Sequence, residues 1–296
     1  MHTRTCSLAA MALLLGACQT PPRQAAAHPA NPQQPPAPAA ASSQPGTPTP
    51  ATAPAPPSPA HAPAVAPAPP APPAPPVPPA PPAAPASVDL RPALTAAGFT
   101  PRPQGPRGTC SIFTTCEAIE FAAAKATGVN TRMSPEFVNW AGWNAAGHPS
   151  DGNFFHNALA GFEKSGICAE TSMPYQPSFD AGHAPTTEAL AEAAARRDLL
   201  KDRVAVRWIV PWQPDRFGVN PDQFAEVKRV LASGYPVAAG SGHSRLLVGY
   251  KDDPNLPSGG VFLTEDSALN RFDEVTYQFV REQVADVFWV EAVKTH

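Results

Sequence analysis

The sequence predicts an α+β fold for the folded part of the chain, with a helical first half and a mainly antiparallel β-sheet in the second half. Between residues 110 and 232, apolar residues recur at helical spacing and are flanked by helix start and stop signals. From residue 236 onward, short apolar runs are separated by glycine and proline, a pattern typical of strands. Two segregated halves are expected to leave a cleft between them.

The first predicted helix follows Cys110. The stretch SIFTTCEAIEFAAAKATG (residues 111–128) places apolar side chains three and four residues apart and ends in Gly128, so Cys110 is expected in the first turn. Further helices are predicted from their capping, proline, alanine and glycine signals, beginning at Ser134-Pro135 and over residues 157–164, 187–200 and 221–232.

Strands are predicted after these helices. The runs are 236–241 (PVAAGS), 246–252 (LLVGYKD), 259–266 (GGVFLTED) and 287–293 (VFWVEAV). The first two are joined at Gly242, so His243 is expected in the connection that opens the second strand.

Residues 21–87 differ in composition from the rest. They consist almost entirely of Pro, Ala, Ser, Gln and Thr and hold more than half of the 42 prolines. Such a segment cannot offset the entropy cost of ordering a core, and its proline runs favour extended polyproline II. We expect a disordered, semi-stiff tether; a ligand for proline-reading domains is the alternative.

The N-terminus has the features of an export signal. An apolar run over residues 7–15 is too short to span a membrane and has the size of a signal-peptide core. The sequence LGAC (residues 15–18) resembles the bacterial lipobox, in which the peptide is cut before the cysteine and that cysteine is diacylated. The resemblance implies a signal peptide over 1–17 and lipid on Cys18, which begins a tether over 18–87. Gln19 implies an outer-membrane lipoprotein, facing either the periplasm or the cell surface. An ordinary secretory signal followed by cysteine is the alternative.

The remaining residues, 88–296, have ordinary globular composition and are enough for one domain. This part carries all the acidic residues and a net negative charge, without a basic cluster, so nucleic acid is not expected as a partner. No Cys/His spacing suggests zinc, and we expect a monomer without a metal or cofactor.

Cysteine usage bears on which thiol is free. If Cys6 leaves with the signal peptide and Cys18 carries lipid, three cysteines remain in an oxidising setting. Three is an odd number, so one thiol stays free or pairs outside the molecule. If Cys116 and Cys168 form a disulfide, the free thiol is Cys110.

Cys110 is the candidate nucleophile. The positive end of a helix dipole lowers the pKa of a cysteine in the first turn. The preceding turn at Gly105, Pro106 and Gly108 brings backbone N–H groups toward a substrate oxygen, and Gln104 adds a side-chain amide donor.

Here the sequence resembles the papain family of cysteine peptidases, especially its bacterial branch, over nearly all of residues 88–290. The Gln104-to-Cys110 spacing of six and the run from His243 to Tyr250 are the most specific matches. The other matching segments occur in the family's order: Val88-Asp89-Leu90-Arg91, Ser134-Pro135-Glu136-Phe137, Asp151-Gly152-Asn153, Met173-Pro174-Tyr175 and Phe262-Leu263-Thr264-Glu265-Asp266-Ser267.

The resemblance implies a papain-like two-part fold with the active-site cleft between its halves, and it implies a role for each matched residue. Cys110 would attack a carbonyl carbon, with His243 as its ion-pair partner. Gln104 and the Cys110 backbone N–H would hold the oxyanion. Asp266 stands where the family usually has Asn and would orient the imidazole, although the neighbouring Glu265 is an alternative in the same strand.

Three positions depart from the family pattern. The family's Trp after the nucleophile is Ser111, the cysteine usually found three residues before the nucleophile is Arg107, and the Trp after the orienting Asn-Ser is Ala268. A family disulfide is therefore missing, and the shield over the orienting residue is missing or built differently.

The leading hypothesis is a membrane-anchored papain-like cysteine peptidase that hydrolyses peptide bonds in a polypeptide substrate. One alternative is an amidase, acyltransferase or peptidoglycan-peptide hydrolase using the same triad. The other is a catalytically inactive papain-fold lipoprotein that binds a partner.

Overall fold

The computed structural model of this protein describes residues 85–293. The predicted signal peptide, the lipid-bearing Cys18 and almost all of the proline-rich tether lie outside the described residues. Within residues 85–293, no helix combines the length and the apolar character that crossing a membrane requires.

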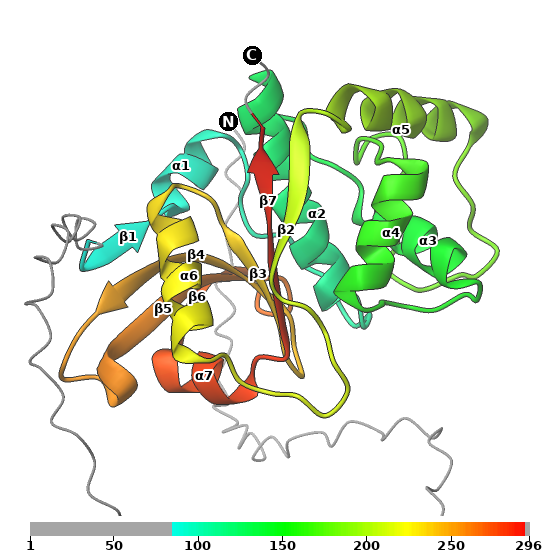
Figure 1. The fold of residues 1–296 in the computed structure, drawn as a ribbon. Coiled ribbons are helices and arrows are strands. Elements are labelled where there is room, and N and C mark those ends of the chain that lie inside the picture. The colour runs from blue at the N-terminus through cyan, green and yellow to red at the C-terminus, as the bar shows by residue number, and fades with distance from the viewer. Residues whose placement is uncertain (1–84, 294–296) are drawn as a thin grey trace, which may run out of the picture. The chain divides into compact units, whose positions relative to one another are not determined.

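The described chain is a mixture of helices and strands (Figure 1). The helices are α1 (Arg91–Ala96), α2 (Cys110–Thr127), α3 (Pro135–Ala146), α4 (Phe155–Ser165), α5 (Thr187–Leu200), α6 (Pro221–Ala232) and α7 (Tyr277–Gln283), with a 3-10 turn, η1, at Pro257–Gly259. The strands are β1 (Ser87–Asp89), β2 (Val204–Val210), β3 (Val237–Gly240), β4 (Arg245–Asp252), β5 (Gly260–Asp266), β6 (Arg271–Thr276) and β7 (Asp286–Ala292).

The predicted helices form where the sequence supplies their end signals. The hydroxyl of Ser134 accepts a hydrogen bond from the backbone N–H of Phe137 at 2.9 Å and caps α3. Asn220 and Gln223 form a reciprocal capping box at the start of α6. Gly128 ends α2 with a φ of 73°, a left-handed conformation that glycine adopts without strain.

The strands form one antiparallel sheet in the order β2-β7-β3-β4-β5-β6, and β1 pairs with β4 beside this path. In Figure 1, α3, α4 and α5 lie on one side of the molecule, the sheet with α6 and α7 lies on the other, and α2 runs between them. The predicted α+β architecture, with a helical part and an antiparallel part, is therefore confirmed.

The central helix α2 is enclosed by both parts. All residues from Ser111 to Ala123 are buried. Ile112 and Ile119 pack in one apolar cluster with Leu246 and Phe288 of the sheet, and fully burying each such side chain contributes about 1.5–3 kcal/mol. The helix that begins at Cys110 is thus fixed in position by the core.

Five elements were not predicted from the sequence: β1, β2, β6, α1 and α7. Strand β6 is polar and partly exposed, and β1 has only three residues, so neither has a strong local pattern. Strand β2 interrupts the predicted order of helices followed by strands, because it precedes α6 and pairs with the distant β7.

The folded part also begins earlier than residue 88. Ser87 pairs with Lys251 across β1 and β4, and the Ala86 carbonyl accepts a hydrogen bond from the Asp252 N–H at 2.8 Å. Residues 85–87, assigned by composition to the tether, are held by backbone pairing, which composition does not reveal.

Candidate active site

Three separate elements bring Cys110, His243 and Asp266 together. Cys110 is the first residue of α2, His243 lies in the turn between β3 and β4, and Asp266 ends β5. The turn is held by Ser241, whose hydroxyl donates to the His243 carbonyl at 2.6 Å. Because β4 and β5 are paired, with Leu246 opposite Glu265, the residues at these strand ends are neighbours.

The imidazole of His243 contacts the other two side chains. Its Nε2 lies 2.9 Å from Asp266 Oδ1, and the Cys110 thiol is close enough to influence its pKa. Burial lowers the pKa of His243, but the hydrogen bonds with Asp266 and Cys110 and the negative charges of both outweigh it, so that the pKa rises to about 9. The surroundings therefore favour the imidazolium form.

The Cys110 thiol is half-buried at the N-terminus of α2. Burial is the largest influence and raises its pKa, but three contacts outweigh it: the hydrogen bond and charge of His243 and the backbone N–H groups of Ser244 and Ser111. The pKa of Cys110 consequently lies below its usual value, so both partners are shifted toward a thiolate–imidazolium pair.

Asp266 is held in one orientation by its own strand end. The backbone N–H groups of Ala268 and Leu269 donate to Oδ1 at 2.9 and 3.1 Å, the same oxygen that faces His243. Burial alone would raise the pKa of Asp266, but the hydrogen bond and charge of His243, with the Leu269 N–H and Arg245, lower it to about 2. The carboxylate is therefore ionised over the working range of most enzymes.

Glu265, the sequence alternative to Asp266, does not contact the imidazole. Successive side chains of a strand point to opposite faces, and Glu265 lies buried among Arg132, Glu120 and Arg102. Neither of its carboxylate oxygens makes a hydrogen bond within the described residues. Burial, opposed mainly by Arg132, raises its pKa to about 7.

Gln104 is connected to the same strand end. Its backbone N–H donates to the Ser267 carbonyl at 3.0 Å, and the Ser267 hydroxyl donates to its Oε1 at 2.7 Å. Its Nε2 donates to the Arg107 carbonyl at 2.7 Å. An amide nitrogen carries two N–H bonds, and the second makes no hydrogen bond with another described residue, so it remains available as a donor.

Arg107 holds the loop that precedes Cys110, at the position of the family's missing cysteine. Its guanidinium donates to Glu136 at 2.5 Å, to Asp151 at 2.9 Å and to the Gln176 carbonyl at 3.0 Å. It also lies 4.5 Å from the centre of the Tyr175 ring. A buried set of charge-assisted hydrogen bonds therefore stands in place of a covalent cross-link.

Gly152, in the matching segment Asp151-Gly152-Asn153, lies against the same loop. A Cβ at this position would come within 2.0 Å of the Gly108 carbonyl oxygen, and Gly152 has a φ of +82°. Next to it, the Asn153 carbonyl accepts a hydrogen bond from the hydroxyl of Ser111, the residue that follows the nucleophile.

Arg245 contacts the site and was not predicted from the sequence. Its Nε donates to Asp266 Oδ2 at 3.0 Å, its Nη1 donates to the His243 carbonyl at 3.3 Å, and its guanidinium lies 5.5 Å from the Phe279 ring centre. The side chain binds the same carboxylate that accepts the Ala268 N–H, and Ala268 is the position where the family has a Trp. The available signal was its place at the first position of the strand that follows His243.

The possible Cys116–Cys168 disulfide is absent, and all three cysteines of the described residues are free thiols. The Cys116 thiol points into the main core cluster and donates to the Met133 carbonyl at 3.3 Å. Cys168 packs in a different cluster with Phe137 and Met173. The two thiols are therefore buried in different apolar clusters, where each packs as a small apolar side chain.

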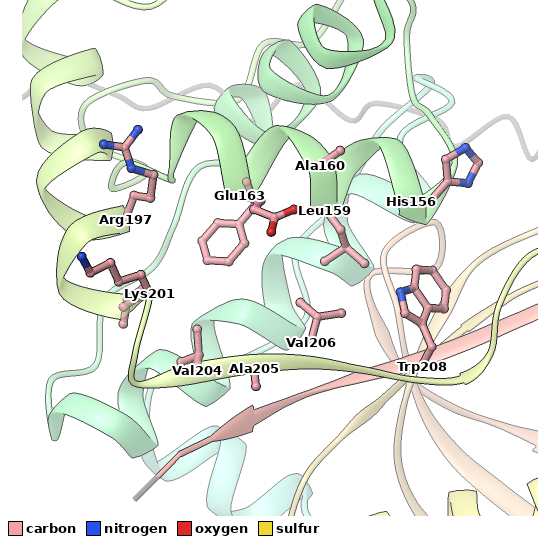
Figure 2. Close-up of a pocket in the computed structure, with 12 residues that line it drawn as sticks. His156, Leu159, Ala160, Glu163, Arg197, Lys201, Val204, Ala205, Val206 and Trp208 are labelled. Carbon is pink, nitrogen blue, oxygen red and sulfur yellow. The ribbon is translucent and has the colours of Figure 1, made fainter. Parts of the chain in front are cut away.

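A separate cavity of about 470 Å³ lies between α4, the end of α5 and β2 (Figure 2). Figure 2 shows His156 and Trp208 at one end of it and Arg197 and Lys201 at the other. Its lining does not include Cys110, His243 or Asp266. Within residues 85–293, no group of three or more His, Cys, Asp and Glu side chains is arranged to hold a metal ion.

No protein-family model and no curated protein matches this chain in sequence. Solved structures do match in fold. Xylellain, a cysteine protease from Xylella fastidiosa, is 18% identical over 72% of this chain and 88% of its own, with a TM-score of 0.56. Digestive procathepsin L 3 from the larval midgut of Tenebrio molitor is 16% identical over 71% of this chain and 70% of its own, with a TM-score of 0.52. The proform of the ragweed pollen allergen Amb a 11, a cysteine protease, is 18% identical over 71% of this chain and 67% of its own, with a TM-score of 0.51. The chain therefore has the papain-like two-part fold that the sequence predicts.

Proposed function

We propose that the protein is a papain-like cysteine peptidase that hydrolyses peptide bonds, with Cys110 as nucleophile, His243 as acid and base, Asp266 as orienting residue and Gln104 as oxyanion donor. The observation that carries this proposal is His243, whose imidazole makes a hydrogen bond with Asp266 and interacts with the Cys110 thiol strongly enough to raise its own pKa. The fold shared with three cysteine proteases supports the same reading.

The first half of the reaction follows from the favoured ionisation states. The Cys110 thiolate attacks the carbonyl carbon, forming a C–S bond while the carbonyl π electrons move to oxygen. The free N–H of Gln104 and the backbone N–H of Cys110 stabilise that oxyanion. The imidazolium of His243 then donates its proton to the leaving nitrogen, the C–N bond breaks, and a thioester remains on Cys110.

The second half restores the enzyme. Neutral His243 accepts a proton from water as the water oxygen attacks the thioester carbon. Collapse of this intermediate breaks the C–S bond, releases the carboxylic acid product and returns the electron pair to sulfur. Asp266 keeps Nε2 of the ring occupied throughout, so the other ring nitrogen stays directed at the thiol.

Alkylation of the thiol tests the proposal. An epoxide that alkylates papain-type thiols is applied to the wild type, to Cys110→Ala and to Cys116→Ala, at pH 6 to 7. We expect fast labelling of the wild type and of Cys116→Ala, and none of Cys110→Ala. If the wild type reacts no faster than an exposed cysteine, the proposal of a cysteine peptidase is wrong and an inactive binding protein is favoured. Cleavage of peptide libraries compared with purified peptidoglycan then separates a peptidase from a peptidoglycan-peptide hydrolase or other acyl-transfer enzyme.

We also propose that the mature chain is an outer-membrane lipoprotein anchored through Cys18. The supporting observation is the LGAC sequence after a short apolar run, followed by a long proline-rich segment. Growth with an alkyne-tagged fatty acid is expected to label the wild type but not Cys18→Ser, and to place the wild type in the outer-membrane fraction. Equal labelling of both proteins would contradict the anchor. Treatment of intact cells with an external protease distinguishes a surface from a periplasmic orientation.

A further inference from the structure

Strand β2 is the end strand of the sheet and has a free edge. It pairs with β7 on one side only. Within residues 85–293, no backbone group of Val204–Trp208 makes a hydrogen bond outside the β2–β7 ladder. In an antiparallel pair, the N–H and C=O groups of alternate residues point away from the partner strand. The free edge therefore presents donors and acceptors to which another chain could pair.

The cavity between α4, the end of α5 and β2 borders this edge. Val204, Ala205 and Val206 all line it. Successive side chains of a strand point to opposite faces of the sheet, so three consecutive residues line one cavity only where the backbone edge itself does. In Figure 2, α4 lies on one side of β2 and the red β7 on the other, so the edge that β7 leaves free faces the cavity.

The dimensions of the cavity suit one extended segment. Its volume of about 470 Å³ is within the range of ligand sites. At about 3.3 Å per residue, the strand from Val204 to Trp208 spans about 13 Å. The register of β2 shifts only between Trp208 and Val210, so the part of the strand that lines the cavity is regular. An added strand of about five residues can therefore pair along it.

The walls of the cavity are mainly apolar. Leu159, Phe162 and Leu200 line it from the two helices, and Val206 and Trp208 line it from the strand. All five belong to the main core cluster or pack against it. Alternate side chains of an added strand point to the same face of the sheet as Val206 and Trp208. Apolar residues at every second position of the added strand would bury surface against these walls.

One end of the cavity carries positive charge. Figure 2 shows Arg197 and Lys201 at the end where β2 begins. Arg197 donates to the Lys164 carbonyl at 2.9 Å and pairs with the exposed Asp198 at 3.0 Å, while Lys201 is exposed. Glu163 is the one acidic residue of the lining. A strand added antiparallel to β2 ends where β2 begins, so its terminal carboxylate would meet the two cations.

We propose that the free edge of β2 binds the C-terminal segment of a partner polypeptide as an added antiparallel strand, with its carboxylate at Arg197 and Lys201. Main-chain hydrogen bonds supply affinity, and the apolar walls select the alternate side chains. Antiparallel pairing continues the pattern of every other strand pair in the described sheet. The lining excludes Cys110, His243 and Asp266, so this docking site is additional to the proposed active site and independent of it.

Peptide binding tests the site. The full chain with Cys110→Ala, which excludes cleavage by this thiol, is titrated with heptapeptides that carry an N-terminal fluorophore, a free C-terminus and Val, Leu or Phe at alternate positions. Anisotropy reports binding. We expect the tightest peptide to bind about 10-fold more tightly than its C-terminal amide. Adding Arg197→Gln and Lys201→Gln together should reduce this acid-to-amide ratio to about one.

Backbone pairing is tested separately from charge. N-methylation of one alternate set of peptide amides should weaken binding about 10-fold, because those N–H groups donate to β2, while methylation of the other set should have a smaller effect. Hydrogen exchange of the amides in Val204–Trp208 should slow about 10-fold when the peptide is bound. Binding without slower exchange in this strand would contradict the proposal.

A cavity-filling variant places the peptide. Ala160 of α4 is exposed and lines the cavity, so Ala160→Trp fills it without entering the core and should abolish binding. The matched control is Ala225→Trp, at an exposed position of α6 outside the lining, which should leave binding unchanged. Thermal melting checks that both variants are folded.

The remaining outcomes are decisive. Absence of binding by every peptide, equal binding of acid and amide, or binding that survives Ala160→Trp would each overturn the docking site. Binding of dodecanoate without binding of any peptide would assign the cavity to a fatty acid and also overturn it. With Cys110 intact, Ala160→Trp should leave the rate of epoxide labelling unchanged. Failure of the docking site and failure of the proposed peptidase are therefore separate results.

Discussion

Arg245 Nε donates a hydrogen bond to Asp266 Oδ2 at 3.0 Å, the carboxylate oxygen that His243 does not contact. Asp266 therefore faces two cationic groups at once, with 1% of its side chain exposed. The arrangement holds both oxygens of the carboxylate in place. One oxygen interacts with the imidazole and the other with the guanidinium.

Replacing Arg245 by Ala is expected to shift the pH dependence of the reaction as well as its rate. Without the guanidinium, the full charge of Asp266 acts on His243 and its pKa rises above about 9. The alkaline limb of kcat/KM, where imidazolium is lost, then moves to higher pH, while looser orientation lowers kcat about 10-fold. A pH profile measured with a peptide substrate checks this.

The control for Arg245 is Arg271→Ala on β6, a guanidinium whose side chain is 63% exposed and which pairs with Asp273. It should leave the profile unchanged. A purely structural role for Arg245 would appear as lower thermal stability of Arg245→Ala with its alkaline limb in place.

Asp266→Asn is expected to shift the same limb in the opposite direction. Burial lowers the pKa of His243, and Asp266 and Cys110 both raise it, with the hydrogen bond to Asp266 as the largest raising influence. Removing the charge of Asp266 lowers the pKa, so imidazolium is lost at a lower pH and the alkaline limb moves down. The stronger variant Asp266→Ala also removes the orienting acceptor and should reduce kcat about 100-fold. Alkylation rates of Cys110 measured from pH 4 to 10 report the shift independently of turnover.

Glu265→Gln is the matched comparison for Asp266 and carries its own stability prediction. Burial raises the pKa of Glu265 from 4.5 to about 7, so the folded protein binds this proton more tightly than the unfolded chain. Stability of the wild type therefore falls as pH rises from 4.5 through about 7, and the cost of the buried charge is fully present above that. We expect Glu265→Gln to melt a few degrees higher than wild type at pH 8 and no higher at pH 4, with catalytic rates within about 3-fold. A large loss of activity would instead implicate Glu265 in orienting His243.

The chain's local signals were enough to predict the helices α2 to α6 but not the contacts between them. Ser134 and Asn220 cap helices through neighbours three residues away, so their role is visible in sequence. Strand β2 has the β-branched and aromatic content of a strand, yet its partner β7 lies about 80 residues further on. Local pattern does not specify such a pairing.

The same distinction applies to the candidate site. Cys110, His243, Asp266 and Gln104 were predicted from a family order of motifs, and the structure brings their segments together. The burial of Asp286 was not predicted, because only the packing of β3 and β7 places its carboxylate against Gly240.

The thiol content of the protein tests the correction to the cysteine pairing. With Cys116 and Cys168 both free, residues 85–293 are expected to contribute three reactive thiols after denaturation, whereas a Cys116–Cys168 bridge would leave one. In the folded protein, burial raises the pKa of Cys168 to about 12 and raises that of Cys116 well above its usual value. Only Cys110 should then react quickly near neutral pH. Counting modified thiols by mass, before and after denaturation, gives both numbers.

Arg107→Ala is expected to cause a large loss of stability together with a loss of activity. The Arg107 side chain is 2% exposed and neutralises Glu136, whose side chain is 5% exposed, so its removal leaves a buried carboxylate without a cation. Breaking such a pair costs about 3–5 kcal/mol. The loop that bears Gln104 also loses the side chain that connects it to Glu136 and Asp151, so the oxyanion donor loses its fixed position. Urea unfolding at pH 7 measures the first effect. The double variant Arg107→Met with Glu136→Gln, which removes both charges and nearly keeps their volume, should recover most of the stability. A loss below 1 kcal/mol for Arg107→Ala would show that the loop is held by other contacts.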